Sequence, residues 1–178
     1  HVASLNPRGV ILSGGPASVY EPNAPMAPSW LYESQLPVLG ICYGLQVLAH
    51  QLGGKVVPGS RREYGHAVLH QNAEQNLLFA DLPSSMTVWM RHGDQVQELP
   101  PGFRSLAYTD NSPIAVMGND SIIGIQFHPE VNQKMHMKWL YYAGWMLNKK
   151  GAQQRMHQLN LRVKHGKKIN MWLDYFLD

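Results

Sequence analysis

The sequence predicts an α/β fold in which a mostly parallel central sheet is covered by helices on both faces. Two short apolar runs, in RGVILSGGP (8–16) and in LPVLGI (36–41), have the length and composition of buried strands. The segment between them, APSWLYESQ (27–35), is predicted to be helical. Buried strands that alternate with helices are typical of parallel sheets with both faces covered.

The rest of the chain adds one clear helix and a middle part rich in strands. Apolar residues recur at helical spacing from Leu45 to Leu52, and Gly53-Gly54 predicts the end of that helix. Gly118-Asn119-Asp120 predicts a hairpin turn. Short β-branched or aromatic runs between turn residues predict further strands: YGHAVLH (64–70), MTVWMRH (86–92), RSLAYTD (104–110), PIAVMG (113–118) and IIGIQFH (122–128).

The composition indicates a single domain over residues 1–178, because a chain of this length with 44% apolar residues can bury one well-filled core. The single cysteine cannot form an internal disulfide. No N-terminal segment joins a basic start to a long apolar stretch, as a secretion signal would. We therefore expect a cytoplasmic protein without a membrane segment.

The net charge of +3 hides an uneven distribution. Residues 1–130 carry six Lys or Arg against ten Asp or Glu, whereas residues 131–178 carry nine against two. Such a basic segment is most often a solvated helical face, and a docking surface for an acidic partner is the alternative. Aromatic residues lie among the basic ones, but at helical spacing they are more typical of core or partner contacts. Nucleic-acid binding is therefore not expected.

Cys42 lies where the second predicted strand becomes a helix. Glycine on either side, in Gly40-Ile41-Cys42-Tyr43-Gly44, permits the sharp turn that exposes a nucleophile at the carboxyl edge of a sheet. The backbone N–H groups and the dipole at a helix start favour a thiolate. A lone cysteine is also among the most commonly buried residues. The pentapeptide alone therefore leaves open whether Cys42 is a nucleophile or a core residue.

A thiolate that attacks a carbonyl needs a base, and the base needs an orienting acceptor. His128 and Glu130 offer both, because residues two apart in an extended segment point to the same side. The oxyanion of acyl transfer needs N–H donors, and the N–H of Tyr43 is one candidate. A second donor is expected from Ser13-Gly14-Gly15-Pro16, which no Gly-Lys-Ser/Thr follows, so that this loop is not a phosphate-binding P-loop.

Taken together and in this order, these motifs resemble the class I glutamine amidotransferases, and within that family the amidotransferase part of GMP synthetases. The resemblance covers most of residues 8–131 and implies a three-layer, flavodoxin-like fold. It rests on five segments of the sequence: ILSGGPASVYE (11–21), PVLGICYGLQVLAHQLGGKV (37–56), REYGHAVL (62–69), VWMRHGDQV (88–96) and IGIQFHPEV (123–131).

The resemblance implies a glutaminase that hydrolyses L-glutamine to glutamate and ammonia. A separate ATP-pyrophosphatase subunit or domain would use the ammonia to aminate XMP to GMP. ATP and Mg²⁺ are expected only in that partner module, and no metal or cofactor is expected in this chain. The implied site residues are Cys42, His128 and Glu130 as the triad, Gly15 and Tyr43 as oxyanion donors, and Gln46 with the backbone of His92, Gly93 and Asp94 as the glutamine site. The resemblance also implies that Asp94 helps to couple the two modules.

The chain departs from the family pattern in three places. The family begins with a further strand and helix, so the resemblance implies that a central strand of the family is missing from this sequence. Arg91 stands where a small Ser or Thr is usual, and it could crowd or charge the glutamine pocket. A basic insertion at about 132–163 precedes the expected closing helix at about 166–178. This insertion is either a cap or docking element beside the triad or a plain surface excursion.

Two other functions stay open on the sequence alone. The same scaffold could serve another amidotransferase pathway or a γ-glutamyl hydrolase, which shares a Cys-His-Glu architecture. Alternatively, the chain could be a docking or regulatory relative without turnover, an interpretation that Arg91 and the basic insertion motivate.

Overall fold

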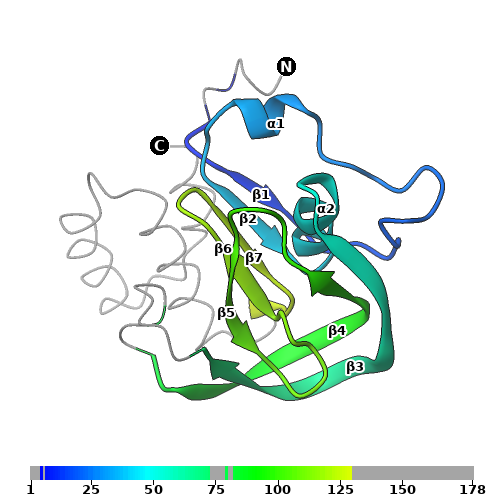
Figure 1. Cartoon of the computed structure of the whole chain (residues 1–178), viewed down its shortest axis with the longest axis vertical. Coiled ribbons are helices and arrows are strands. Elements are labelled where there is room, and N and C mark those ends of the chain that lie inside the picture. Colours follow the sequence, from blue (N-terminus) through cyan, green and yellow to red (C-terminus); the bar gives the residue numbers. More distant parts are fainter. Residues whose placement is uncertain (1–4, 6, 73–78, 80–81, 130–178) are drawn as a thin grey trace, which may run out of the picture.

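The computed structural model describes residue 5, residues 7–72, residue 79 and residues 82–129. Within this part of the chain, one sheet of seven strands packs against two α-helices (Figure 1). In chain order the elements are β1 (Val10–Leu12), α1 (Trp30–Glu33), β2 (Val38–Ile41), α2 (Tyr43–Gln51), β3 (Lys55–Gln71), β4 (Ser85–Glu98), β5 (Arg104–Tyr108), β6 (Val116–Gly118) and β7 (Ile122–Ile125).

The parallel part of the sheet consists of β1, β2 and β7, with β2 in the middle. The strand order is β1-β2-β7-β6-β5-β3-β4, and beyond β7 every described pairing is antiparallel. Antiparallel neighbours need only a short turn, whereas a parallel pair needs a crossover of about a dozen residues or more. The predicted α/β class is confirmed. We expected a mostly parallel sheet, and among the described strands the parallel ones are β1, β2 and β7.

The predicted elements around Cys42 are present. β1 and β2 lie inside the two segments predicted as buried strands, and α1 is one turn inside the segment predicted as helix. α2 ends where the glycine pair predicts. Gly53 has a φ of +95°, which glycine adopts without strain, and the Gly54 N–H donates to the Ala49 carbonyl at 2.8 Å.

Each face of the sheet carries its own apolar cluster, because side chains alternate between the faces along a strand. Val38 belongs to one cluster and Leu39 to the other. The Val38 cluster contains Leu31 of α1 and Leu45 of α2, so the two described helices cover the same face. On the Leu39 face, the hairpin of β3 and β4 covers the described sheet where we expected helices. It contributes Leu69, Met86, Val88 and Met90.

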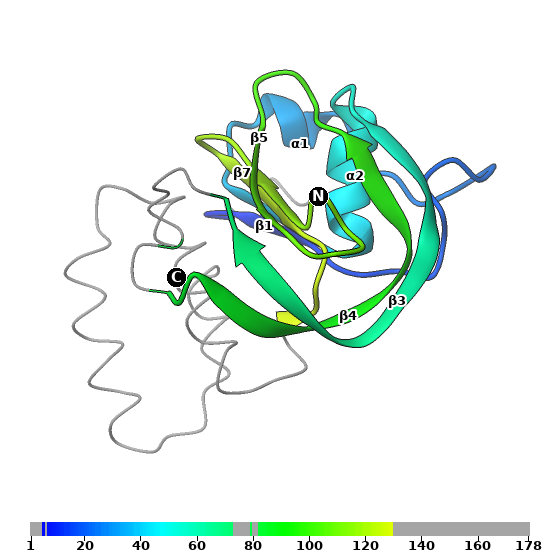
Figure 2. The ribbon, with the colours of Figure 1, turned by 60° about the horizontal axis from the view of Figure 1, so that its bottom comes forward.

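This hairpin is long and curves across the end of the sheet (Figure 2). The strands predicted at 64–70 and 86–92 form the half of the hairpin nearest the connection between β3 and β4, and both strands extend beyond the predicted bounds. The register shifts between Pro58 and Glu63, where proline has no N–H for the ladder. β4 is the edge strand of the sheet, and the curved hairpin brings it to the segment that follows β7. There the His128 N–H donates to the Trp89 carbonyl at 2.8 Å.

The predicted hairpin turn joins β6 to β7. The Asn119 side-chain oxygen accepts from the N–H groups of Ile122 at 2.8 Å and Ser121 at 3.0 Å, and the Asn119 N–H donates to the Ile122 carbonyl at 3.0 Å. An Asn side chain that bonds to backbone two or three residues ahead stabilises a turn of this kind. β5, β6 and β7 all lie within segments predicted as strands.

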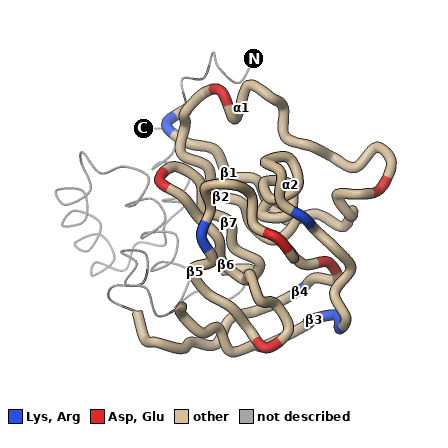
Figure 3. The backbone as a smooth tube through the Cα atoms, viewed as in Figure 1, with Lys and Arg blue, Asp and Glu red and all other residues tan. Residues whose placement is uncertain are grey.

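Charged residues are dispersed over the described part of the chain (Figure 3). The basic insertion expected at about 132–163 and the closing helix expected at about 166–178 lie outside the described residues. No helix among the described residues is long and apolar enough to cross a membrane.

Candidate active site

Cys42 occupies the junction between β2 and α2, as predicted. Its φ of +52° is one that side chains rarely adopt, and such a conformation costs on the order of 1–3 kcal/mol. Two backbone hydrogen bonds hold it there: the Cys42 N–H donates to the Ile125 carbonyl at 2.8 Å, and its carbonyl accepts from the Gln46 N–H at 3.2 Å. The strained junction directs the side chain to the carboxyl end of the parallel strands. The residue is 5% exposed there, so it is buried where the pattern of glycines predicted an exposed side chain.

The glycines around Cys42 are needed for close packing. A Cβ atom on Gly44 would lie 2.1 Å from the Leu12 carbonyl oxygen, and one on Gly40 would lie 2.6 Å from the Gly44 carbonyl carbon. Both distances are shorter than atoms can approach, and both involve backbone. The Gly-x-Cys-x-Gly pattern therefore lets the start of α2 pack directly against β1 and β2.

His128 lies beside Cys42 although the two are far apart in the sequence. A Cβ atom on Gly14 would lie 3.1 Å from His128 Cε1 and 3.7 Å from Cys42 Cβ. The loop after β1, the end of β2 and the segment after β7 thus converge at one place. β7 ends at Ile125 and the chain bends before His128, so this residue follows the strand and does not lie in the extended segment that we expected.

The loop after β1 also lies against the start of α2. A Cβ atom on Gly15 would lie 3.3 Å from the Tyr43 ring, a close contact. Backbone N–H groups in the first turn of a helix have no acceptor within the helix, and the N–H of Tyr43 is one of these. Gly15 and Tyr43 are therefore neighbours next to Cys42. Glu130, the third expected member of the triad, lies outside the described residues.

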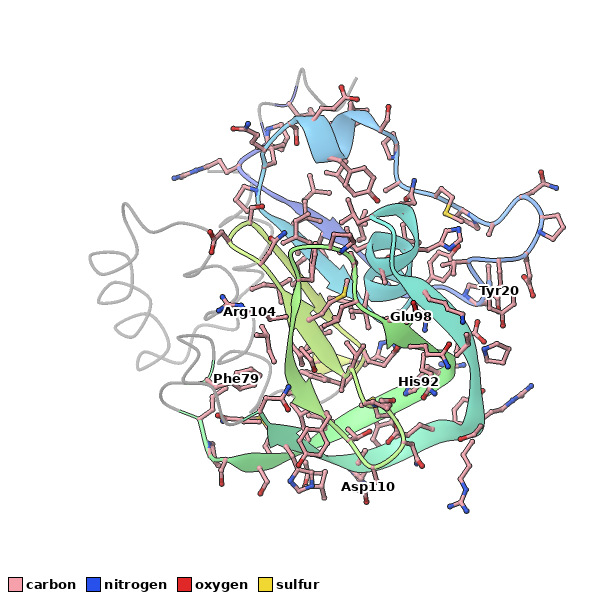
Figure 4. The ribbon with its side chains drawn as sticks, viewed as in Figure 1. Tyr20, Phe79, His92, Glu98, Arg104 and Asp110 are labelled. Carbon is pink, nitrogen blue, oxygen red and sulfur yellow. The ribbon has the colours of Figure 1, made fainter. Side chains whose placement is uncertain are left out.

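The Asp94 carboxylate anchors the loop after β1. It accepts hydrogen bonds from the hydroxyls of Ser18 and Tyr20, the latter at 2.8 Å (Tyr20 is labelled in Figure 4). The loop that carries Gly14 and Gly15 is thereby tied to β4. Among the described residues, no group of three or more His, Cys, Asp or Glu side chains is placed to hold a metal ion.

The Asp94 carbonyl joins β4 to α2. It accepts from Gln46 Nε2 at 3.0 Å and lies 2.9 Å from His92 Nδ1. The structure thus brings together Gln46, His92 and Asp94, which we expected to hold the substrate, with Gly93 between the last two. The side chains of Gln46 and His92 are buried and form hydrogen bonds within the protein.

His92 and Glu63 form a buried pair that the sequence analysis did not identify (His92 is labelled in Figure 4). His92 Nε2 lies 3.0 Å from Glu63 Oε2. The same carboxylate accepts hydrogen bonds from Ser112 Oγ at 2.9 Å and Thr109 Oγ1 at 3.1 Å. Because His92 Nδ1 faces the Asp94 carbonyl, both ring nitrogens lie next to oxygen acceptors.

The pKa of Glu63 lies below its ordinary value of 4.5. Burial alone would raise this pKa, but hydrogen bonds from His92 and Ser112, the charge of His92 and the hydrogen bond from Thr109 together outweigh burial. One sequence signal could have revealed the pair. Glu63 shares the inward face of β3 with the fully buried Leu69, and an acidic residue at such a position needs partners.

Two buried amides connect Asp94 to the cysteine sulfur. Gln46 Nε2 also donates to Gln126 Oε1 at 3.3 Å, and Gln126 Nε2 donates to Cys42 Sγ at 3.7 Å. Gln126 was not among the residues singled out from the sequence. The Arg91 carbonyl lies 3.6 Å from the same sulfur, whereas Arg91 itself is exposed, so its guanidinium is not packed into the buried part of the site.

The model of the family glutamine amidotransferase class-I matches residues 1–145. The chain belongs to this family. A glutamine-hydrolyzing GMP synthase of Dehalococcoides mccartyi strain CBDB1 is 61% identical over 138 residues, which cover 77% of this amidotransferase chain and 26% of that protein. The GMP synthase of strain ATCC BAA-2266 of the same species is 49% identical over 179 residues, covering 94% of this chain and 33% of that protein.

A solved structure shows the same amidotransferase fold. A candidate GMP synthase subunit from Thermoplasma acidophilum has a TM-score of 0.60 and 28% identity, covering 73% of this chain and 65% of that chain. The predicted family, fold class and enzyme class are thereby confirmed. The chain spans about a quarter to a third of the length of the two curated relatives.

Proposed function

We propose that this chain is the glutamine-hydrolysing part of a GMP synthase, with Cys42 as its nucleophile. The observation that carries the proposal is the convergence of Cys42 and His128 on Gly14, in a chain of the class I amidotransferase family. The names of the curated relatives support the GMP synthase assignment. Glutamine is the substrate in this account.

Hydrolysis proceeds in two acyl-transfer steps. Cys42 Sγ attacks the side-chain amide carbon of glutamine while the thiol proton passes to His128. His128 then protonates the leaving nitrogen, the C–N bond breaks, and ammonia leaves a thioester on Cys42. Water, deprotonated by His128, attacks the thioester and releases glutamate and the thiol. Glu130 orients the imidazole in this scheme, as the acidic member of a triad does.

The surrounding residues take supporting roles in the proposal. The N–H groups of Gly15 and Tyr43 donate to the oxyanion that forms in each step. Gln46 and the backbone of residues 92–94 hold glutamine, and Asp94 couples this chain to its partner. The proximity of Gly15 to Tyr43 and the contacts of Asp94 with Gln46 and Ser18 support these assignments.

The ammonia is consumed in a separate ATP-pyrophosphatase module. That module aminates XMP to GMP with ATP and Mg²⁺, so neither group acts at Cys42. The share of the curated relatives that this chain spans leaves room for such a module in those proteins. The chain and the module would work together in the cytoplasm, as one fused protein or as two subunits.

The test is glutaminase activity of the wild type and of Cys42→Ala, each with and without an XMP-aminating subunit. We expect ammonia release from glutamine by the wild type, stimulation by the subunit charged with XMP and ATP, and no release by Cys42→Ala. γ-Glutamyl peptides, offered as alternative substrates, should be hydrolysed poorly. Preference for these peptides over free glutamine would overturn the GMP synthase assignment in favour of a γ-glutamyl hydrolase.

A further inference from the structure

Gln126 is fully buried directly behind the nucleophile. Its amide nitrogen lies 3.7 Å from Cys42 Sγ, and its backbone N–H is fixed by the Ala115 carbonyl at 2.8 Å. We propose that Gln126 is a further catalytic residue, whose amide N–H donates to the Cys42 sulfur and stabilises the thiolate. This inference rests on the proposed function, because it takes Cys42 as the attacking group.

The orientation of the Gln126 amide follows from its neighbours. The Asp94 carbonyl can only accept, so Gln46 must present its nitrogen there, at 3.0 Å. The second N–H of the Gln46 amide then meets Gln126 at 3.3 Å, which requires an oxygen on Gln126 at that point. The Gln126 nitrogen is left facing the sulfur. Gln46 is thus a positioning residue, because its side chain fixes the orientation of the Gln126 amide.

The series of hydrogen bonds that ends at the sulfur begins at the buried pair of His92 and Glu63. His92 donates to the Asp94 carbonyl from Nδ1, while its Nε2 faces the Glu63 carboxylate at 3.0 Å. Hydrogen bonds run from this pair through Asp94, Gln46 and Gln126 to the sulfur. All four residues are less than a tenth exposed, at 7% for Glu63, 6% for His92, 3% for Gln46 and 0% for Gln126. In such a dry environment a hydrogen bond to a charged sulfur is stronger than in water.

Both contacts of the sulfur are present in the structure, and only the one to the Arg91 carbonyl depends on the thiol proton. As a thiol, Cys42 donates its S–H to the Arg91 carbonyl at 3.6 Å. Once the proton has moved to His128, that carbonyl faces a negative sulfur and no longer attracts it. The Gln126 N–H, the start of α2 and the imidazolium of His128 then face the thiolate. Among the described residues, the titratable groups that bear on the sulfur are His128 directly and His92 with Glu63 through the series of hydrogen bonds.

The test uses the fact that Cys42 is the single cysteine, so alkylation of the protein by iodoacetamide reports on this sulfur alone. Gln126→Met keeps the length of the side chain and removes the N–H. We expect its alkylation rate at neutral pH to fall about tenfold, with the pH profile displaced about one unit upward and a similar plateau at high pH. Superimposable profiles for Gln126→Met and the wild type, with the fold intact, would overturn the proposal.

Two more variants separate donation from packing. Gln46→Met does not touch the sulfur but removes the group that orients Gln126, so the profile should move in the same direction, and the double variant should match Gln126→Met alone. Gln51→Met is the matched control: this amide lies in the same helix but bonds to Ala27 and Tyr32. A displaced profile in Gln51→Met would count against the proposal. If Gln126→Met does not fold, Gln46→Met decides.

A failure of this inference can be told apart from a failure of the proposed function. If Cys42→Ala loses glutaminase activity while the profiles of Gln126→Met and the wild type coincide, Cys42 is the nucleophile and Gln126 only packs. If Cys42→Ala retains glutaminase activity, the proposed function is wrong, and any displaced alkylation profile reports on the sulfur but not on catalysis.

Discussion

The backbone conformation of Cys42 is unfavourable in free energy, so other contacts in the protein must stabilise it. Hydrogen bonds to the end of β7 and along α2, together with the direct approach of α2 to β1, maintain it. His128 lies on the segment that follows β7 and comes near Cys42 at Gly14. Strain kept by surrounding packing is typical of catalytic positions.

At the residue scale we predict that His128→Ala loses turnover with little loss of stability. The side chain is the proposed proton carrier, whose removal typically costs about 100-fold to 10,000-fold in rate, whereas its backbone hydrogen bond to Trp89 persists. Steady-state glutaminase kinetics and thermal melting measure the two effects. His50 is an exposed histidine in the last turn of α2, and His50→Ala is the control, which should keep the turnover and the stability of the wild type. Turnover in His128→Ala near the wild-type rate would remove His128 from the mechanism.

Arg91 gives a second prediction at this scale. Its side chain is exposed, and its neighbours in β4, Met90 and His92, are buried on the opposite face. Arg91→Ser should therefore change kcat/KM for glutamine by less than about threefold, as is usual for an exposed position. A large fall in KM in this variant would show that the guanidinium obstructs the glutamine pocket, as the sequence suggested.

Residue roles differ in how far the sequence reveals them. Cys42 stands out because the glycines around it have a local meaning, and His128 because a carboxylate follows it. Gln126 and Glu63 do not, because their partners are distant: the Gln126 contact with Cys42 spans 84 positions, and the Glu63 contact with Ser112 spans 49. Only the folded chain shows that these buried polar groups are satisfied.

At the element scale, the β2–α2 junction depends on contact between backbones. Gly44→Ala should destabilise the protein by about 3 kcal/mol or more, or prevent folding, because the added Cβ would lie 2.1 Å from the Leu12 carbonyl oxygen. Alanine's better helix propensity, about 1 kcal/mol, is too small to offset this clash. Urea denaturation measures the difference.

The control for Gly44→Ala is Gly93→Ala, where a Cβ atom meets nothing closer than 3.9 Å. Its free energy of unfolding should stay within about 1 kcal/mol of the wild type. Equal stability of Gly44→Ala and the wild type would mean that α2 does not approach β1 as described.

Local elements could be predicted where the pattern is strong, and long-range shape could not. Short apolar runs predict β1 and β2, and apolar residues at helical spacing followed by a glycine pair predict α2. The length of β3 was underestimated because its first half, around Pro58 to Arg62, is polar and interrupted by a register shift. The curvature of the hairpin, which brings β4 to Cys42, depends on contacts with distant parts of the chain and leaves no local pattern.

For the molecule as a whole, we predict a loss of stability in acid that comes from the lowered pKa of Glu63. Because its pKa is lowered, the folded state binds a proton on Glu63 less readily than the unfolded chain. Its contribution to stability is therefore present above the ordinary value of 4.5 and is lost as the pH falls through the lowered pKa. Glu63→Gln should lower the melting temperature at neutral pH and flatten its fall below about pH 5.

Melting curves between neutral and acid pH measure this dependence. Glu98→Gln is the matched control, because Glu98 pairs with Lys55 at the surface with its side chain 65% exposed, and such pairs contribute little. An acid dependence in Glu63→Gln as steep as that of the wild type would mean that the buried pair with His92 does not contribute to the pH dependence.

The central claim is that Cys42 forms a covalent bond with the acyl group of glutamine. The most direct measurement is treatment with the glutamine analogue 6-diazo-5-oxo-L-norleucine, followed by mass spectrometry of the digested protein. We predict one adduct, on the peptide that contains Cys42, formed in step with the loss of glutaminase activity and absent from Cys42→Ala. An adduct on another residue, or glutaminase activity that survives complete modification of Cys42, would contradict the account.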